Sequence, residues 1–558
     1  MSAYPDPQKH VVLAGSGRRH RAGSEVLGRA DPNERVYITV KLNRTTPIPE
    51  PVAGAAVISR DQAISDHGAD EDAVKKVAKT LADYGLTIMS EDAARRSVKA
   101  SGPVERMEAI FQTHLFRVKH GEHLYRGRVG PISLPAELDG MVQGVFGLDT
   151  RPMISHRRPK KGRPAAPASQ LPAPDQRAWF LPQELASAYA FPGKDGSGTT
   201  IGIIELGGKY VASDLDAFVQ AAGLPGTPEV QVVNVDPLAA TDANDPDAIG
   251  EVMLDVEVVA GACPGAKIVL YFSPFTERGW VDVIDAALAD SANNPCVLSI
   301  SYGLAEGVDI WTQQAMDVVS DAMKEAAARG IPVCVASGDD GSDDQVGDGR
   351  AHVNFPATSP YVLSVGGTAL VKTGANPSSE LVWFDGDGLR RDGGGSTGGG
   401  VSAAFGRPAW QASINIPSVN PGAPAGRIAP DISANAAGST GYFTISEGQA
   451  GVSGGTSAAT PLWAALISRL VETRTPVGYL TPLLYEAASG GGTIGSQACN
   501  DIVSGNNNTA AAGGYAARQG FDAVTGWGSP KGDDLAQVLA ARQAAQAAQT
   551  PKPLAPAE

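Results

Sequence analysis

Cysteine is rare in this chain of 558 residues, and several other features are missing. The four cysteines have no CxxC spacing, so the sequence argues against a zinc site of that type and offers no disulfide framework. We expect buried free thiols. No apolar run approaches the roughly 18 residues of a membrane span, and residues 1–24 have no apolar core of signal-peptide length. For that reason we expect no membrane span. There is also no base-reading motif or clustered basic helix, so we expect no nucleic-acid partner.

Charge and histidine are distributed unevenly along the chain. Residues 1–176 carry 26 Lys and Arg against 20 Asp and Glu, a net charge of +6. Residues 177–558 carry 19 against 40, a net charge of −21. Seven of the eight histidines lie in the first part, and only His352 lies in the second. A cationic segment joined to an anionic body predicts an intramolecular clamp held by charge.

The first third of the chain alternates between helical and strand patterns. We expect a flexible leader over residues 1–34 and a small α+β domain of ferredoxin-like type over residues 35–156. Within it the patterns predict strands at 36–42, 86–89, 97–100 and 114–120, and helices at 70–85 and 103–113. Residues 157–176 are rich in Pro, Ala, Lys and Arg, which predicts an exposed linker open to cleavage.

Residues 177–545 show a second pattern, in which near-continuous apolar runs alternate with helical segments. The predicted strands are 200–206, 230–235, 267–272, 296–302, 332–337 and 361–367, and the predicted helices are 247–262, 278–289 and 310–329. Such runs predict an α/β fold with a parallel sheet covered by helices on both faces. A chain of this length is too long for one hydrophobic core, so this is a second, larger domain. The biased tail, 546–558, is expected to be disordered.

The stretch VSGGTSAATP, residues 452–461, presents Ser457 behind two glycines and ahead of an apolar run. A nucleophilic serine at a helix start would be presented in this way, but it needs a base, and the usual base is histidine. The only histidine of the large domain, His352, lies in the loop-like stretch GRAHVNFPATSP, which is typical of a surface or packing residue.

Carboxylates are the other candidates for the base. Glu251 and Asp255 are four residues apart in GEVMLDVEVVAGACPG, so on a helix they share one face, and their apolar neighbours indicate a buried helix. Two acids that close separate their proton affinities, so one can hold a proton while the other is ionised. A third acid, Asp339, follows the strand PVCVASG, at the edge of the sheet where such folds place their ligands. Each segment also has a structural explanation: an exposed acidic helix face or an N-terminal dipole effect for the pair, and a Gly-Asp turn for Asp339.

Together, Ser457, Glu251, Asp255 and Asp339 resemble the sedolisin family, the serine-carboxyl peptidases, and within it the kumamolisin-like pro-enzymes. The resemblance covers nearly the whole chain, and the first part resembles the family's propeptide. Its motifs are IGIIELGGKY (201–210), EVMLDVEV (251–258), SISYG (299–303), SGDDGS (337–342), GGGVS (398–402), TPVGYL (475–480) and GWGSPKG (526–532).

This resemblance implies a subtilisin-like α/β fold and an endopeptidase made as a zymogen. It also implies that Ser457 is the nucleophile, Glu251 the general base, Asp255 the acid that orients the base, and Asp339 the group that stabilises the oxyanion. With a carboxylate base and a protonated Asp339, activity is expected at acidic pH, about 3 to 5.

The chain departs from the family pattern at a few positions. Asp340 follows Asp339 where relatives usually have Ser, so two acids compete for the oxyanion role, and we favour Asp339 by its position. Tyr302 stands where close relatives often have Trp, and Thr460 where Ala is usual. Glu205 is either an extension of the acid network, as in some relatives, or a buried structural acid.

The resemblance further implies one calcium ion near the C-terminus, in CNDIVSGNNN (499–508) and ARQGFDAVTG (517–526). The implied ligands are the carboxylates of Asp501 and Asp522 and the backbone carbonyls of Ile502, Arg518 and Gly520. Hard oxygen ligands in a flexible loop suit calcium. Arg518 takes a position that is Gly in some members, and without the resemblance both loops would be interpreted as ordinary Asn/Gly turns.

The charge asymmetry suggests how the enzyme would be held inactive. At neutral pH a propeptide of net charge +6 can sit on a catalytic domain of net charge −21. On acidification the carboxylates lose charge and the histidines gain it, so the attraction weakens and the linker 157–176 becomes open to cleavage.

Other expectations concern partners and alternatives. We expect protein or peptide substrates, the chain's own propeptide as an intramolecular inhibitor, a monomer, and an extracellular location. Two alternatives remain: a subtilisin-type serine protease that uses His352 and works near pH 8, and a non-catalytic binding module on the same fold.

Overall fold

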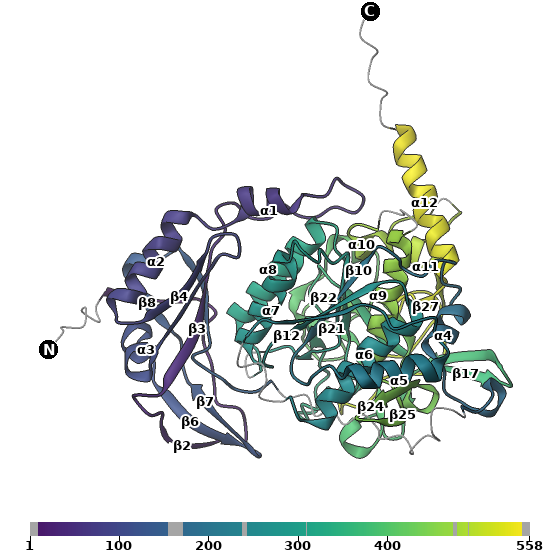
Figure 1. The fold of residues 1–558 in the computed structure, drawn as a ribbon, viewed down its shortest axis with the longest axis horizontal. Helices are drawn as coiled ribbons and strands as arrows, with labels where there is room; N and C mark the ends of the chain where they lie inside the picture. Colours follow the sequence, from purple (N-terminus) through teal and green to yellow (C-terminus); the bar gives the residue numbers. More distant parts are fainter. Residues whose placement is uncertain are drawn as a thin grey trace, which may run out of the picture.

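The computed structural model describes residues 9–153, 171–236, 243–307, 310–472, 477–488 and 490–549. Two domains lie side by side, and the chain order runs from the smaller to the larger (Figure 1). Of the expected linker, residues 157–170 lie outside the described residues, and a short 3-10 helix at Pro174–Gln176 precedes the larger domain.

The N-terminal domain is built around an antiparallel sheet in the order β4-β5-β3-β9. Its strands are β3 (Arg35–Leu42), β4 (Thr87–Asp92), β5 (Ser97–Pro103) and β9 (Val142–Phe146), and its helices are α2 (Glu71–Asp83) and α3 (Val104–Phe111). Asp70 caps α2 by accepting a hydrogen bond from the Ala73 backbone N–H, and the apolar face of that helix is buried. This β-α-β-β-α-β order confirms the ferredoxin-like prediction.

Residues 9–34 do not form the flexible leader that we expected. They contribute β1 (His10–Val12), which pairs with β8 (Ser133–Pro135), and β2 (Glu25–Arg29), which pairs with β6 (Leu115–His120). β6 in turn pairs with β7 (His123–Arg128). Every residue of β2 is exposed, so the segment carries no buried apolar periodicity that a sequence pattern could reveal. Its order comes from backbone pairing with the edge of another strand.

The larger domain contains a mainly parallel sheet in the order β11-β12-β10-β13-β15-β17-β18, with β23 also paired to β17. The strands are β10 (Thr200–Glu205), β11 (Val230–Asn234), β12 (Lys267–Phe272), β13 (Val297–Ile300), β15 (Val333–Ala336), β17 (Leu363–Thr373), β18 (Asn376–Val382) and β23 (Ile432–Asn435). Only the β17–β18 pair is antiparallel among the described pairs of this sheet. The predicted parallel sheet is therefore confirmed.

Helices cover both faces of this sheet. Successive residues of β10 point to opposite faces, so that Ile203 joins the core formed with α6 and α9, and Ile204 joins the core formed with α7 and α8. The helices are α5 (Ala212–Ala222), α6 (Pro246–Ala262) and α9 (Thr456–Glu472) on one face, and α7 (Glu277–Ala289) and α8 (Gln313–Ala328) on the other. Because both faces are covered, the strands are apolar along nearly their whole length.

Shorter elements complete the structure. The remaining helices are α1 (Arg60–His67), α4 (Pro182–Ala188), α10 (Leu480–Leu483), α11 (Ile494–Ala498) and α12 (Gly532–Gln549). The remaining strands are β14 (Leu304–Ala305), β16 (Asn354–Phe355), β19 (Phe384–Asp385), β20 (Gly395–Ser396), β21 (Gly400–Gly406), β22 (Gly426–Ala429), β24 (Tyr442–Ser446), β25 (Gln449–Ser453), β26 (Cys499–Asn500) and β27 (Ser529–Pro530). Residues 546–549, expected in a disordered tail, instead continue α12; the rest of that tail lies outside the described residues.

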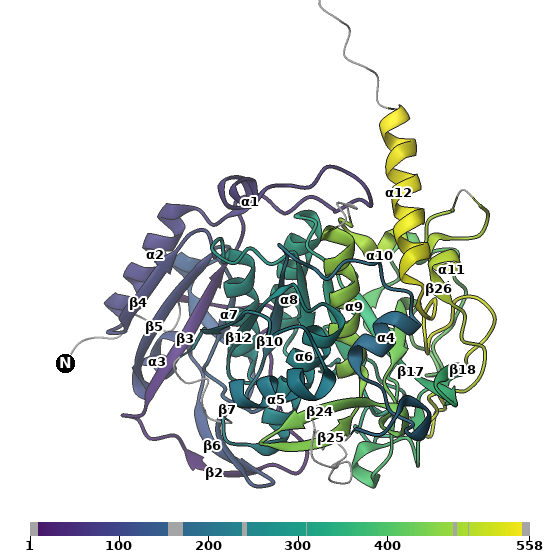
Figure 2. The ribbon, with the colours of Figure 1, turned by 45° about the vertical axis from the view of Figure 1, so that its right-hand side comes forward.

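The N-terminal domain packs against α7 and α8, as both views show (Figures 1 and 2). Phe146 of β9 enters the core of the larger domain beside Trp280. Around it, basic side chains of the small domain reach acids of the two helices: Arg18–Glu277 (2.7 Å), Lys99–Asp282 (3.0 Å), Arg44–Asp321 (2.8 Å), Arg44–Glu325 (3.0 Å), Arg96–Asp321 (2.7 Å) and Lys41–Asp285. These ion pairs confirm the predicted charge clamp between the two parts.

The structure also bears on the cysteines and on the length of the apolar helices. Cys263, Cys334 and Cys499 are buried free thiols, and Cys296 is a half-buried one. Among the described residues, none of the helices is long and apolar enough to cross a membrane.

Candidate active site

The helix α6 carries the predicted acid pair. It begins after Asp245, whose side chain accepts a hydrogen bond from the Asp247 backbone N–H, and Pro246 occupies the first turn, where its missing N–H costs nothing. Glu251 and Asp255 lie one turn apart on this helix, and both are buried, with 7% and 0% of their surface exposed. The prediction of a buried helix with two acids on one face is confirmed.

Ser457 lies in the first turn of α9, as predicted, and is 3% exposed. Its hydroxyl lies 3.3 Å from the carbonyl oxygen of Ser301, just beyond the end of β13. Pro461 stands four residues further along the helix and has no N–H to give to the Ser457 carbonyl. The Ser301 hydroxyl lies 3.1 Å from that carbonyl. The Ser301 hydroxyl therefore takes the place of the helical N–H that the Ser457 carbonyl lacks.

Ser301 links the nucleophile to the acid pair. Its hydroxyl lies 2.9 Å from Asp255 Oδ1, so a single side chain contacts both α6 and the start of α9. The hydroxyl has one proton and two acceptors within reach. Ser301 was not among the predicted site residues, although it lies within the SISYG motif. The neighbouring Tyr302 donates its phenolic hydrogen to buried Glu205 of β10 at 3.1 Å.

Asp339 lies three residues beyond the end of β15 and reaches Thr456, the residue before Ser457. Its Oδ1 accepts hydrogen bonds from the backbone N–H of Thr456 (2.8 Å) and from the Thr456 hydroxyl (2.7 Å). Gly455 makes this approach possible, because it has φ 108° and a Cβ there would lie 2.8 Å from Asp339 Oδ2. The structure thus holds Asp339 against the loop that presents Ser457.

Asp340 has a different set of partners. Its carboxylate accepts hydrogen bonds from the backbone N–H (2.7 Å) and the Nε (2.8 Å) of Arg390 and from Gln345 Nε2 (2.8 Å). Arg390 lies in a 3-10 helix at Arg390–Asp392, and its Nη1 is also 3.4 Å from Asp339 Oδ2. Asp340 thus binds Arg390, whereas Asp339 binds Thr456, the residue before Ser457.

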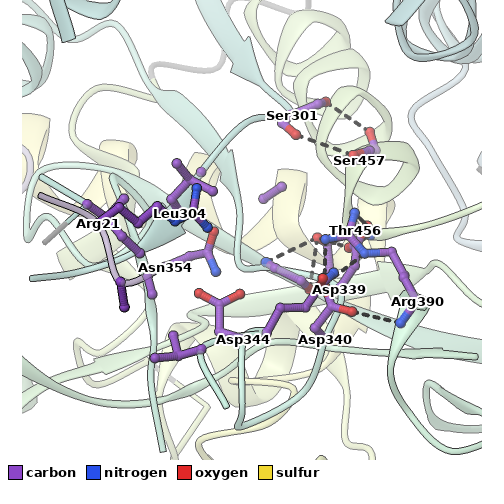
Figure 3. A pocket seen from close by; sticks show the side chains of 18 of the residues that line it. Arg21, Ser301, Leu304, Asp339, Asp340, Asp344, Asn354, Arg390, Thr456 and Ser457 are labelled. Carbon is purple, nitrogen blue, oxygen red and sulfur yellow. Dashed lines mark hydrogen bonds and ion pairs between the residues drawn. The ribbon is translucent and has the colours of Figure 1, made fainter. Parts of the chain in front are cut away.

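A third acid, Asp344, lies on the same loop as Asp339 and Asp340. Burial raises the pKa of the Asp344 carboxyl well above its usual range, and the charge of Asp340 adds to the effect. Figure 3 shows Asp344 facing the space between Asn354 and Asp339. A raised pKa favours the neutral form of this carboxyl.

Ser457 and the acids Asp339, Asp340 and Asp344 line a pocket of about 350 Å³ (Figure 3), and the acid pair of α6 is not among the residues that line it. Its other walls come from Ser301, Asn354 and Arg390. The N-terminal domain closes one side with Arg21, Ala22 and His120. A pocket of this size, with convergent polar groups around a serine, is a candidate active site.

His352 is not among the residues that line this pocket. Its ring Nε2 lies 2.9 Å from Asp348 Oδ1, four residues earlier in the same loop. These contacts are those of a packing residue, as the sequence predicts.

The two C-terminal loops bring their acids to a common turn. Asp522 accepts hydrogen bonds from the backbone N–H groups of Val524 (2.9 Å) and Arg518 (3.1 Å), and Asp501 accepts one from the Gly520 N–H (2.9 Å). Burial raises the pKa of Asp522 to about 6. Among the described residues no cluster holds three or more His, Cys, Asp or Glu side chains in metal-binding geometry, so carbonyls would have to complete any ligand set. Asp522 lies in this turn and Asp501 contacts it from the other loop, and carboxylate oxygens are the ligand type that calcium prefers.

Comparison with known proteins identifies the chain. The family model of the pro-kumamolisin activation domain matches residues 49–151, and that of the subtilase family matches residues 238–527. Kumamolisin of Bacillus sp. (strain MN-32) is 38% identical over 555 residues, which cover 96% of this chain and 97% of that protein. Sedolisin of Pseudomonas sp. (strain 101) is 31% identical over 491 residues, covering 85% and 80%.

A solved structure agrees with these matches. Pseudomonas sedolisin, a serine-carboxyl proteinase complexed with two molecules of pseudo-iodotyrostatin, aligns with a TM-score of 0.55 and 31% identity over 66% of this chain and 98% of that one. The fold and the serine-acid site therefore define a peptidase of the subtilase class with an activation domain in front. Within that class the chain belongs to the sedolisin family, the serine-carboxyl peptidases, and it is a kumamolisin-like zymogen.

Proposed function

We propose that Ser457 is the nucleophile, Glu251 its general base, Asp255 the acid that orients the base, and Asp339 the oxyanion stabiliser. Support comes from the contact of Ser301 with both Asp255 and Ser457, which joins α6 to the start of α9. It comes also from the two hydrogen bonds between Thr456 and Asp339.

In this mechanism Ser457 Oγ attacks the peptide carbonyl while Glu251 takes its proton. The oxyanion that forms receives a hydrogen bond from protonated Asp339, and the N-terminal end of α9 adds its positive dipole. Glu251 then gives the proton to the leaving amine, and the acyl-enzyme remains. A water molecule, deprotonated by the same carboxylate, attacks the acyl-enzyme and frees Ser457.

The test is a set of pH–rate profiles with a fluorogenic peptide. Full-length chain is first kept at about pH 4 to allow processing, and activity is expected at about pH 3 to 5. Ser457→Ala and Glu251→Gln should each lower kcat by at least about 1,000-fold without a change in the circular dichroism spectrum. His352→Ala is the matched control and should keep kcat/KM within about twofold. Peptide cleavage by Glu251→Gln at the rate of the unaltered chain would refute the assignment, and loss of activity in His352→Ala would favour the subtilisin-type alternative.

We propose that the C-terminal loops hold one calcium ion. Asp501 and Asp522 would supply carboxylates, and Ile502, Arg518 and Gly520 backbone carbonyls. The raised pKa of Asp522 supports this, because a cation would compensate the charge that burial disfavours. The ion would supply structural stability by tying the two loops together.

Thermal melting with and without EDTA tests the calcium site. Chelation should lower Tm by several degrees, and terbium luminescence should report binding. Asp501→Asn should abolish both effects, while Asp533→Asn, at the exposed start of α12, should leave them intact. A melting curve that EDTA does not move would contradict the site.

We propose, finally, that the N-terminal domain is an intramolecular inhibitor that is released by cleavage within residues 157–176. The ion pairs on α7 and α8 and the small-domain residues that line the pocket support an inhibitory role. The substrates would be proteins or peptides, and the enzyme would act outside the cell as a monomer. Mass spectrometry of the full chain at pH 4 and pH 7 tests the release: cleavage in this segment at pH 4 alone is the expected result, and an uncleaved chain at pH 4 would contradict it.

A further inference from the structure

Ser301 lies at the end of a central strand of the large sheet. β13 pairs with β10 on one side and with β15 on the other, so the backbone that leads to Ser301 is held along both edges. Ser301 is fully buried, and its hydroxyl contacts α6 and α9, which cover the same face of the sheet. A rigid strand thus presents one hydroxyl to the helix of the acid pair and to the helix of the nucleophile.

Ser301 makes three contacts with these two helices. Its hydroxyl lies 2.9 Å from Asp255 Oδ1 and 3.1 Å from the Ser457 carbonyl oxygen. Its own carbonyl accepts a hydrogen bond from the Ser457 hydroxyl at 3.3 Å (Figure 3). Ser301 therefore contacts the nucleophile through its backbone and its side chain, and it contacts Asp255 through the same side chain.

Pro461 leaves the Ser457 carbonyl to Ser301. In a regular α-helix this carbonyl would accept a hydrogen bond from the N–H of residue 461, which proline lacks. Any other residue at position 461 would supply an N–H that competes with the Ser301 hydroxyl for this oxygen. The proline in α9 and the serine after β13 are therefore complementary.

We propose that Ser301 is a positioning residue, whose hydroxyl fixes the carboxyl of Asp255 relative to the helical turn that carries Ser457. This role rests on the proposed function of Ser457 and Asp255. Since Asp255 orients Glu251 in that mechanism, a displaced Asp255 carboxyl would displace the base as well. Proton transfer depends steeply on such geometry, because a shift of about 1 Å can cost about 100-fold in rate.

Ser299 offers a matched control on the same strand. It lies two residues before Ser301, so both side chains point to the same face of the sheet, and it is also fully buried. Its hydroxyl has no hydrogen-bond partner among the residues that the structure describes. Ser299→Ala therefore removes an equivalent buried hydroxyl without changing the contacts of Asp255 or Ser457.

Loss of the Ser301 hydroxyl should lower kcat more than it changes KM. Ser301→Ala should lower kcat by about 10- to 100-fold and keep KM within about threefold, because the acids lose their alignment while the pocket keeps its walls. Ser299→Ala should keep kcat within about twofold. Both are measured with a fluorogenic peptide on full-length chain processed at about pH 4, with active enzyme counted by serine titration.

A double-mutant cycle with Pro461→Ala separates the two contacts of the Ser301 hydroxyl. Pro461→Ala gives the Ser457 carbonyl a helical N–H, so in that background Ser301→Ala no longer costs this carbonyl its donor. The fall in Tm caused by Ser301→Ala should then shrink by about half or more. The fall in kcat should persist, because Asp255 still loses the hydroxyl. Calorimetry and steady-state kinetics on the four chains measure both effects.

Three results would overturn this role for Ser301. They are a Ser301→Ala chain with kcat within about twofold of the unaltered chain, an equal loss of kcat in Ser299→Ala, and recovery of kcat together with Tm in the double variant. The last result would show that Ser301 only stabilises the start of α9. If Ser301→Ala alone is too unstable to assay, the double variant, compared with Pro461→Ala, still measures the effect on kcat.

Failure of this inference can be told apart from failure of the proposed function. If Ser457→Ala and Glu251→Gln are inactive while Ser301→Ala is normal, the catalytic assignment stands and only the role of Ser301 falls. If Ser457→Ala cleaves peptide, the proposed function itself falls.

Discussion

Thr456 shows how single atoms prepare the site at the residue scale. It precedes the nucleophile, and its hydroxyl lies within hydrogen-bond distance of both Asp339 Oδ1 (2.7 Å) and the Gly338 carbonyl (3.1 Å). Its methyl group faces Gly367, whose missing side chain makes room for it. The hydroxyl therefore fixes Asp339, and the methyl fills space against β17.

Two substitutions at Thr456 separate these contributions. Thr456→Val keeps the methyl and removes the hydroxyl, so Asp339 loses one donor, and kcat/KM should fall about tenfold at the optimum. Thr456→Ser keeps the hydroxyl and should stay within about twofold. Steady-state kinetics at pH 4 measure both, and equal losses would show that packing rather than the hydrogen bond matters.

The catalytic candidates could be predicted from the sequence because each carries a local signal. Glu251 and Asp255 have helical spacing, and Ser457 and Asp339 follow glycine-rich or strand patterns. Ser301 and Arg390 have no such signal, since their partners lie 46 and 50 residues away in the chain. Contacts over such distances depend on how strands and loops are brought together, which periodicity does not encode.

At the scale of elements, α6 combines two kinds of buried acid. Asp255 lies 2.9 Å from the Ser301 hydroxyl, whereas Glu257 accepts a hydrogen bond from the Ile445 backbone N–H of β24 at 2.8 Å. Burial raises the pKa of Glu257 well above its usual range, although that hydrogen bond works in the opposite direction. Glu257 thus binds its proton more tightly in the folded than in the unfolded chain.

This difference predicts how stability depends on pH. A carboxyl whose pKa is raised by folding stabilises the folded chain most at pH values below its unfolded pKa, which is about 4. This stabilisation is lost as the pH rises toward the pKa of the folded chain. Glu257→Gln should therefore make Tm fall less between pH 5 and 7, and should raise Tm at pH 7 by about 2 to 4 °C. Glu447→Gln, on the exposed turn between β24 and β25, is the control and should behave as the unaltered chain. Calorimetry at both pH values measures Tm, and an equal change of Tm between pH 5 and 7 in all three chains would contradict the prediction.

Elements differed in how well the sequence revealed them. The strands β10, β12, β13 and β15 were predictable because burial on both faces makes them continuously apolar. The strands β1 and β2 were not, because they are short and mostly exposed, and they exist through pairing with distant edges. Strand β18 is exposed over most of its length and was missed for the same reason.

For the whole molecule, the contact between the domains depends on acids of α7 and α8. In the described contacts two basic side chains of the N-terminal domain, Arg44 and Arg96, reach Asp321, whereas each of the other acids is reached by one from that domain. Asp317, one turn earlier on α8, is exposed and bonds only to Gln313 in the described contacts. The two positions form a matched pair on one helix.

Weakening this contact should speed maturation. Asp321→Asn removes the charge that two arginines share, so the activation domain should separate more readily, and cleavage at a given acidic pH should be about five- to tenfold faster. Asp317→Asn should mature at the normal rate. Gel or mass-spectrometric time courses at pH 4 to 6 measure this, and equal rates for all three chains would show that these ion pairs do not limit release.

The wall that the N-terminal domain gives to the pocket has one more consequence. Arg21, Ala22 and His120 narrow a partly open pocket of about 350 Å³ beside Ser457, which suits a small molecule but not an extended polypeptide. The zymogen should thus discriminate by size: a compact phosphonylating reagent could still modify the serine, while a folded macromolecular inhibitor would be shut out until the activation domain has gone.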